Sequence, residues 1–142
     1  MVSNIRNKFI IIGFLLIISL FIYASFNFIF KGPTAPFFIV NNHDVKGHEV
    51  TVEVSDQNKK SIMNETYSLE PKGDMSQARP FSLRFYQEKK EYIFKVTVDK
   101  QITKTVKTEI PDRYTFVYIN LYYNDYESPE IIPIFIVTTE YC

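Results

Sequence analysis

The sequence predicts an all-β fold, an antiparallel β-sandwich of about 7–8 strands, preceded by one N-terminal transmembrane helix. Three observations lead to this fold class. Residues 9–30 contain no charged residue. Beyond residue 36, apolar and polar side chains alternate with a period of two, which is typical of half-buried strands. Short polar turns separate the alternating runs, and no helical period appears after the N-terminal segment, as in all-β sandwiches.

The uncharged segment 9–30 is long enough to cross a membrane. Its 22 residues would reach roughly 33 Å as a helix, against a hydrocarbon core of about 30 Å. Backbone groups in lipid must pair within the segment, so a helix is expected. Arg6 and Lys8 precede the segment and Lys31 follows it. The positive-inside rule therefore places residues 1–8 in the cytoplasm and the rest of the chain outside it.

A cleaved signal peptide is the alternative for this segment, because it shares the basic start and the apolar run. However, the apolar part of a signal peptide is usually shorter, and no A-x-A-like site occurs near Ala24 or Ser25. A lipoprotein signal needs a cysteine directly after the apolar run, and the only cysteine is Cys142. We therefore expect an uncleaved signal anchor that crosses the cell membrane once and has the lipid bilayer as its partner.

The remaining chain is expected to be a short linker, residues 31–36, and one extracytoplasmic domain, residues 37–142. The linker "KGPTAP" carries the Gly and Pro that end a helix. All sixteen acidic residues and thirteen of the sixteen basic ones lie beyond Lys31, so the outer part has a net charge of −3. This charge argues against nucleic acid as a partner, which needs a basic surface. The single cysteine, Cys142, could link two chains, carry a lipid or be inert.

The alternation predicts a strand in each of eight segments: 36–40, 48–56, 61–69, 81–87, 91–99, 102–110, 114–124 and 131–141. In the second segment Val50, Val52 and Val54 share one face. The tight connection "DKQ" between two of the strands lacks the Gly that a type I′ turn prefers, so its turn type stays open. Residues 70–80 are expected to form a longer connection without a strand.

One stretch carries a family resemblance. Residues 90–106, "KEYIFKVTVDKQITKTV", combine an aromatic-x-aromatic-x-Val-x-Val strand with a hairpin. This pattern resembles the late strands of immunoglobulin-like (Ig-like) domains, and similar modules occur in prokaryotic membrane-anchored surface proteins. The resemblance covers residues 37–142 and places Tyr92 where such folds often carry a corner tyrosine. The paired cysteines and core tryptophan of antibody-type domains are absent, and the likeness implies an architecture without a function.

Both histidines lie in "NNHDVKGHEVTVEVSD", residues 41–56. A metal site would use His43 and His48, with Asp44 as the carboxylate of a two-histidine, one-carboxylate set. However, neighbours on a strand point to opposite faces, so His43 and Asp44 should diverge. The stretch is also rich in turn formers, with Gly47 at the bend. We expect a turn followed by a strand and no metal, with an exported small-ligand or metal carrier that uses His43 and His48 as the alternative.

The stretch "YTFVYINLYYNDY", residues 114–126, is apolar on both faces. It is expected to be a central strand covered on both sides or a strand near the membrane surface, or else to expose an aromatic face. In the second case Tyr118, Tyr122 and Tyr126 would bind another envelope protein or a glycan, since tyrosine provides a large contact area at low entropic cost. Asn64 begins an Asn-x-Thr triplet and is a candidate glycosylation site.

The sequence contains no enzyme signature. There is no G-x-S-x-G elbow, no phosphate-binding G-x-x-x-x-G-K-[ST] loop and no G-x-G-x-x-G motif. Glu49 and Glu53 alternate with valines and are expected on a solvent face. We therefore expect no catalytic residue and no cofactor. The predicted function is that of a membrane-anchored binding or structural module of the cell envelope.

Overall fold

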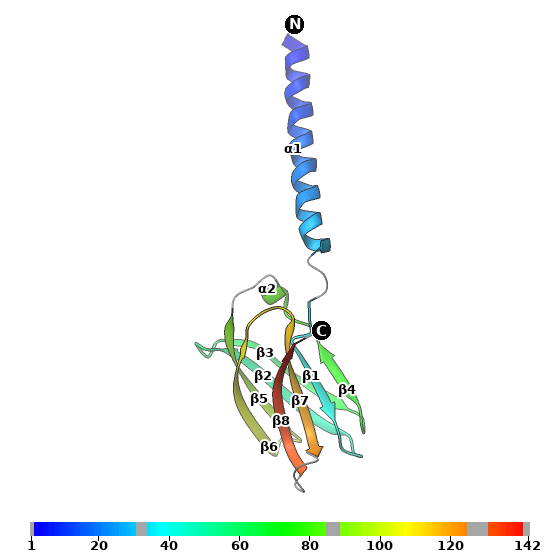
Figure 1. Cartoon of the computed structure of the whole chain (residues 1–142), viewed down its shortest axis with the longest axis vertical. Coiled ribbons are helices and arrows are strands. Elements are labelled where there is room, and N and C mark those ends of the chain that lie inside the picture. The colour runs from blue at the N-terminus through cyan, green and yellow to red at the C-terminus, as the bar shows by residue number, and fades with distance from the viewer. Residues whose placement is uncertain (1, 31–33, 85–88, 125–130, 141–142) are drawn as a thin grey trace. The chain divides into compact units, whose positions relative to one another are not determined.

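The computed structural model describes residues 2–30, 34–84, 89–124 and 131–140 (Figure 1). The chain forms two compact units, Met1–Pro33 and Thr34–Cys142. The first unit is a helix and the second is rich in β-strands.

The helix of the first unit, α1, runs from Val2 to Phe30. Its part from Ile5 to Phe26, 22 residues with a mean hydropathy of 2.7, is long and apolar enough to span a membrane, and none of these residues is buried. Phe9, Leu16 and Phe21 are all more than half exposed. A helix that is apolar around its whole circumference needs an apolar surrounding, which a bilayer supplies.

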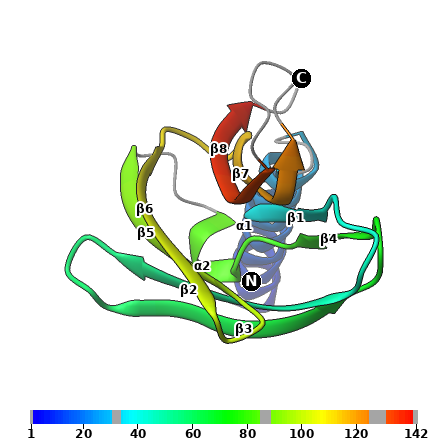
Figure 2. The ribbon, with the colours of Figure 1, turned by 90° about the horizontal axis from the view of Figure 1, so that it is seen from below.

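The second unit is a mostly β domain with two four-stranded sheets, consistent with a β-sandwich (Figure 2). Sheet A has the order β4-β1-β7-β8 and sheet B the order β3-β2-β5-β6. All neighbouring strands are antiparallel except β1 and β7, which are parallel. The strands have these bounds: β1 Phe38–Asn42, β2 His48–Asp56, β3 Ser61–Leu69, β4 Asp74–Gln77, β5 Lys90–Val98, β6 Ile102–Ile110, β7 Thr115–Asn124 and β8 Ile131–Glu140.

The core lies between the two sheets and explains the alternation in the sequence. Every second residue of the central strands points inward, as strand geometry requires. The fully buried side chains include three valines of β2, Val50, Val52 and Val54. Aromatic rings fill the space between the layers: the ring of Phe38 lies 6.1 Å from that of Phe94, at an interplanar angle of 88°. Such edge-to-face pairs stabilise a core beyond the area they bury.

Side-chain contacts join the two sheets along both sides of the domain. On one side the hydroxyl of Tyr67 in β3 donates to Oε1 of Gln77 in β4 at 2.8 Å. On the other side Nζ of Lys104 in β6 donates to the backbone oxygen of Ile134 in β8 at 3.0 Å. The hydroxyls of Thr108 and Thr138 lie 2.5 Å apart on the same side. These bonds tie β3 to β4 and β6 to β8, and the bond from Lys104 also engages a backbone oxygen of β8 within the chain.

Strands β2, β3 and β6 have the bounds expected from the sequence. The prediction of a strand over 81–87 is wrong for residues 81–84, which form the short helix α2, Phe81–Arg84. The amide of Leu83 donates to the carbonyl of Pro80 at 2.9 Å, so the chain turns at the proline, which cannot donate to a ladder. Residues 85–87 lie outside the described part. Conversely, β4 forms inside the connection 70–80, which was expected to carry no strand.

Candidate functional site

The outer face of sheet A is the first candidate site. In β7, Val117, Ile119 and Leu121 are fully buried and point into the core, so Tyr118 and Asn120 point outward. The strand register places Ile39 and Val137 beside Tyr118, and Asn41 and Phe135 beside Asn120. We call this surface the sheet-A face: Ile39, Asn41, His43, Tyr118, Asn120, Tyr123, Phe135 and Val137.

The backbone changes face within β7 at Tyr122, which has a φ of 50°. This left-handed conformation is uncommon for a non-glycine residue and breaks the alternation. The ring of Tyr122 therefore stacks on His48, with centroids 4.5 Å apart. The next residue, Tyr123, stacks on Phe135 of the sheet-A face, with centroids 5.2 Å apart and planes at 17°. The alternation had placed Tyr118 and Tyr122 on one face, and the structure separates them. Tyr126 lies outside the described residues.

Polar side chains are grouped at one end of the sheet-A face. Nε2 of His43 lies 3.0 Å from Oδ1 of Asn120, and Nδ2 of Asn41 donates to the same oxygen at 3.4 Å. The His43 ring also meets Tyr123 edge-on, with centroids 5.5 Å apart. Across β1, β7 and β8, the face has no Asp, Glu, Lys or Arg among the described residues. β4 adds Asp74, paired with Asn41, at the margin.

The outer face of sheet B has a different character. It is polar and carries ion pairs between neighbouring strands. Lys95 pairs with Glu53 at 3.0 Å and Lys107 with Glu91 at 2.8 Å. Threonine hydroxyls meet between β2 and β3 and between β5 and β6, at 2.9 and 3.0 Å. Exposed pairs of this kind add little stability but keep a surface well hydrated. The two outer faces therefore differ in chemistry.

His48 is the centre of the second candidate site, at one end of the domain. Its Nδ1 lies 2.7 Å from Oδ2 of Asp99, in the turn between β5 and β6, and its Nε2 lies 2.9 Å from Oδ2 of Asp44, in the loop between β1 and β2. The imidazole is buried, with 8% of its side chain exposed. We call His48, Asp44, Asp99 and the stacked ring of Tyr122 the His48 clasp. It joins β2 and the β5–β6 turn to β7 and the β1–β2 loop.

The surroundings of each acid in the clasp are built by backbone groups. Oδ1 of Asp99 accepts from the amide of Glu49 at 3.0 Å. Asp99 and Lys100 have φ values of 49° and 58°, which are the positive values of a type I′ turn. Oδ1 of Asp44 accepts from the amide of Val45 at 2.7 Å. Each carboxylate thus accepts a hydrogen bond from a backbone amide as well as contacting the imidazole.

The ionisation of the clasp follows from these contacts. Burial lowers the pKa of His48, but the hydrogen bonds to Asp99 and Asp44 and their negative charges outweigh burial and raise the pKa above its ordinary value of 6.5. The hydrogen bond to His48 lowers the pKa of each carboxyl group below 3.8, for Asp44 and for Asp99. Burial raises the pKa of Tyr122, and the two nearby carboxylates raise it further. The favoured state is an imidazolium between two carboxylates.

The structure does not bring His43 and His48 together as a ligand pair. His43 contacts Asn120 and Tyr123, whereas both ring nitrogens of His48 face carboxylates. Within residues 2–30, 34–84, 89–124 and 131–140, no group of three or more His, Cys, Asp or Glu side chains is placed to hold a metal ion. A metal on His48 would need a nitrogen lone pair, and the carboxylates occupy both nitrogen positions.

Two further features lie outside these sites. Asn64 is exposed on β3, opposite Glu53 of β2, so its side-chain amide is on the solvent face.

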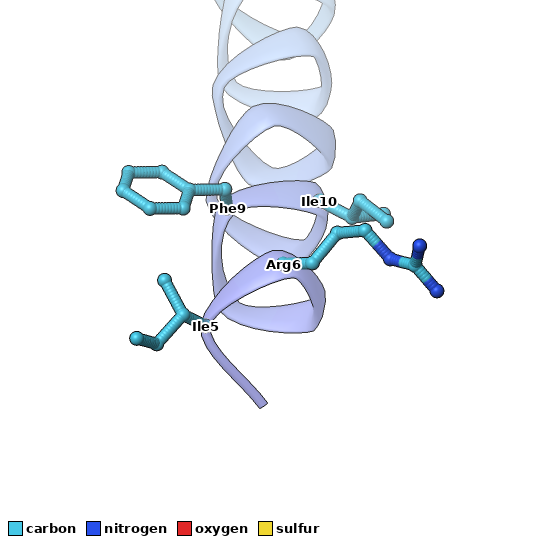
Figure 3. A pocket seen from close by; sticks show the side chains of 4 residues that line it. All are labelled: Ile5, Arg6, Phe9 and Ile10. Atoms are coloured by element: carbon cyan, nitrogen blue, oxygen red, sulfur yellow. The ribbon is translucent and has the colours of Figure 1, made fainter. Parts of the chain in front are cut away.

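A shallow open groove lies on α1 between Ile5, Arg6, Phe9 and Ile10. Figure 3 shows Ile5 and Phe9 on one side of the helix and Arg6 and Ile10 on the other. The groove lies at the N-terminal end of the apolar helix surface.

Comparisons of the chain with protein-family models and with curated proteins find no match. Any functional conclusion therefore depends on the two sites themselves.

Sequence reasoning found His48 and Asp44 but missed Asp99 as a partner of His48. The signal that could have found it is the position of Asp99 in the turn that follows β5. This signal is informative only once β2, which carries His48, is known to pair with β5.

Proposed function

We propose that this chain is a single-pass protein of the cell membrane with its N-terminus in the cytoplasm. In this proposal the outer domain is an Ig-like β-sandwich that acts as a binding module of the cell envelope. The apolar helix α1 supports the anchor, and the positions of Arg6 and Lys8 support the orientation. The two sheets, with a parallel β1–β7 pair beside an antiparallel β7–β8 hairpin, support the Ig-like topology.

The observation that carries the binding role is the difference between the two outer faces. Sheet B presents ion pairs and threonines, while the sheet-A face presents Tyr118, Phe135 and Val137, and its described residues on β1, β7 and β8 include no charged side chain. Val137 is 41% exposed. Aromatic residues with few charges are typical of the centre of protein interfaces, and an uncharged apolar face in water is a candidate interaction surface.

The partner that fits this face best is an uncharged, apolar surface of another envelope protein. A glycan would need ring faces on which sugars can stack, but the rings of Tyr123 and Phe135 stack on each other. A polyanion would need Lys or Arg, which the three main strands do not place there. Anchoring in the same bilayer raises the effective concentration of such a partner, so modest complementarity is enough for association.

Site-specific photocrosslinking in native membranes tests this proposal. A photoreactive phenylalanine analogue replaces Tyr118 in the full chain, and a matched control replaces Thr105 on the outer face of sheet B. We expect a discrete crosslinked protein from position 118 and none from position 105. Products of the same size from both positions, or from position 105 alone, would contradict a sheet-A interface. A product with twice the chain mass would identify a second copy as the partner and overturn the choice of a different protein.

A further inference from the structure

The geometry of the His48 clasp requires a particular proton count. A neutral imidazole has one N–H and one lone pair, so it donates one hydrogen bond. His48 has a carboxylate oxygen at 2.7 Å from one nitrogen and another at 2.9 Å from the other. A lone pair that faces a carboxylate at such a distance is repelled. Both contacts persist together only when the ring is an imidazolium that donates from both nitrogens.

The two carboxylates are fixed by different contacts. Asp99 belongs to the β5–β6 turn, and two backbone bonds attach it to Glu49: its amide donates to the Glu49 carbonyl at 2.8 Å and its Oδ1 accepts from the Glu49 amide. Asp44 belongs to the longer loop between β1 and β2, where its amide donates to Oδ1 of Asn42 at 2.9 Å, its Oδ1 accepts from the Val45 amide at 2.7 Å, and Val45 itself is 71% exposed. A ring that loses a proton can donate to only one of the two acids, and we expect it to keep the shorter bond, at 2.7 Å to Asp99, and to lose the bond to Asp44, at 2.9 Å.

Loss of the Asp44 bond would act on the sheet-A face. Asp44 directly follows His43, which contacts Asn120 and Tyr123 on that face. The same loop is held to the β3–β4 turn, because the Lys72 amide donates to the Asp44 carbonyl at 3.0 Å and Nζ of Lys72 donates to the His43 carbonyl. These contacts form one connected unit, from the imidazole to the end of the face.

We infer that the His48 clasp is a proton-dependent latch that holds the His43 loop against one end of the sheet-A face and frees it when His48 is deprotonated. The inference rests on the proposed function of that face, since it describes how the face is regulated. A binding module outside the cytoplasm experiences changes of external pH directly, and histidine is the side chain best suited to respond to them.

Other charges near the latch do not replace His48. Lys46 lies close enough to Asp44 to lower its pKa slightly, but it does not contact the ring. Lys100 pairs with Glu49 at 3.1 Å and is 82% exposed. Tyr122 lies against the ring, and its raised pKa keeps the phenol neutral across the range in which His48 titrates. The proton that opens and closes the latch therefore belongs to the imidazole and its two carboxylates.

The sign of the pH dependence follows from the directions of these shifts. The pKa of His48 is raised, so its contribution to stability is complete below pH 6.5 and is lost as the pH rises through the folded-state value. The pKa values of Asp44 and Asp99 are lowered, so their contribution is present above pH 3.8 and is lost as the pH falls through their folded-state values. The latch is closed in the window between these two limits.

Two measurements on the full chain in detergent micelles test the latch without any partner. The chain has two histidines, so a His43→Gln variant leaves one imidazole NMR signal, that of His48. We expect this signal to titrate above pH 6.5. Base catalysis alone accelerates amide hydrogen exchange about thirty-fold when the pH rises by 1.5 units. Over such a rise through the titration of His48, exchange at the amides of Val45 and Lys72, which bond to Asp44, should accelerate at least tenfold more than this. In His48→Gln this extra acceleration should be absent.

A second variant covers the case in which His48→Gln does not fold. Asp44→Asn keeps the His48–Asp99 pair and should lower the His48 pKa relative to the parent chain. A His48 signal that titrates at or below pH 6.5, or Val45 and Lys72 exchange with no extra acceleration through its titration, would overturn the latch. Crosslinking from position 118 on both sides of the titration separates the two proposals. No crosslink at any pH, with a working latch, contradicts the proposed function alone, whereas a crosslink of equal yield at both pH values overturns the regulation.

Discussion

At the residue scale, the stability of the domain depends on a few polar side chains that are almost fully buried. Arg79 is 5% exposed, and its guanidinium donates to the backbone oxygens of Asp112 and Thr115 at 3.3 and 2.6 Å. Its charged plane lies over the ring of Phe37, 5.8 Å from the centroid. Burial lowers the pKa of this guanidinium, yet an arginine remains charged at all ordinary pH values. The backbone oxygens and the aromatic ring stabilise that buried charge.

Tyr67 gives a pH prediction at this scale. Burial, with a smaller effect of Glu65, raises its pKa to about 12, and its hydroxyl donates to Gln77 across the two sheets. Because this pKa is raised, the contribution of the protonated Tyr67 side chain to stability is complete below pH 10. The contribution is lost as the pH rises toward about 12. Tyr67→Phe should lower the free energy of unfolding by about 1 kcal/mol near neutral pH. Urea unfolding followed by circular dichroism measures this loss.

The same unfolding series at alkaline pH provides the control. The stability of the parent chain should fall more steeply than that of Tyr67→Phe between pH 10 and pH 12, so the two curves converge. Parallel curves over this range would show that the Tyr67 hydroxyl does not contribute to the alkaline loss of stability.

At the scale of elements, the alternation of the sequence corresponds to strands with one face in the core. In β2, Val52 is fully buried while its neighbour Glu53 pairs with Lys95 on the surface. Val52→Ala should therefore cost about 2–3 kcal/mol of unfolding free energy, because it removes buried methyl groups and leaves a cavity. Glu53→Gln, on the same strand, should cost less than about 0.5 kcal/mol. Equal losses in chemical unfolding would contradict the assignment of the two faces.

Local pattern was sufficient for the strands whose side chains alternate cleanly, and β2, β3 and β6 begin and end as expected. It failed in two places, one because of a local turn and one because of a tertiary contact. Phe81 and Leu83 alternate as in a strand, but the chain turns at Pro80. β4 has four residues and forms because β1 offers an open edge. No local signal announces such a contact, since the partner strand lies more than thirty residues away.

The candidate sites also combine features that the local sequence predicts with features that it does not. The apolar character of the sheet-A face could be predicted from Tyr118 and its neighbours. The switch of faces at Tyr122 could not, because an aromatic residue with positive φ is rare and is held by its ring contact with His48. Asp99 reaches His48 only after β2 and β5 pair, with Val50 opposite Val98. The clasp therefore depends on the pairing of β2 with β5, and neither the sequence around His48 nor the sequence around Asp99 encodes it alone.

At the scale of the whole molecule, the two units have different surfaces. The first is a helix whose apolar side chains surround its axis, and the second has its own core between two sheets. The second unit carries all the acidic residues of the chain, which keeps it hydrated. Under the proposed function, the first unit is a tether and the second a water-exposed body, each stabilised by its own surroundings. The proposal depends most on α1 staying in the membrane and holding the second unit outside the cytoplasm.

Cysteine labelling in intact cells tests this claim most directly. In a Cys142→Ser background, single cysteines replace Val45, which is 71% exposed, or Ser3 before the apolar run. A membrane-impermeant thiol reagent should label Val45→Cys in intact cells and Ser3→Cys only after the membrane is permeabilised. Labelling of Ser3→Cys in intact cells, or of Val45→Cys only after permeabilisation, would contradict the anchored, outward-facing arrangement.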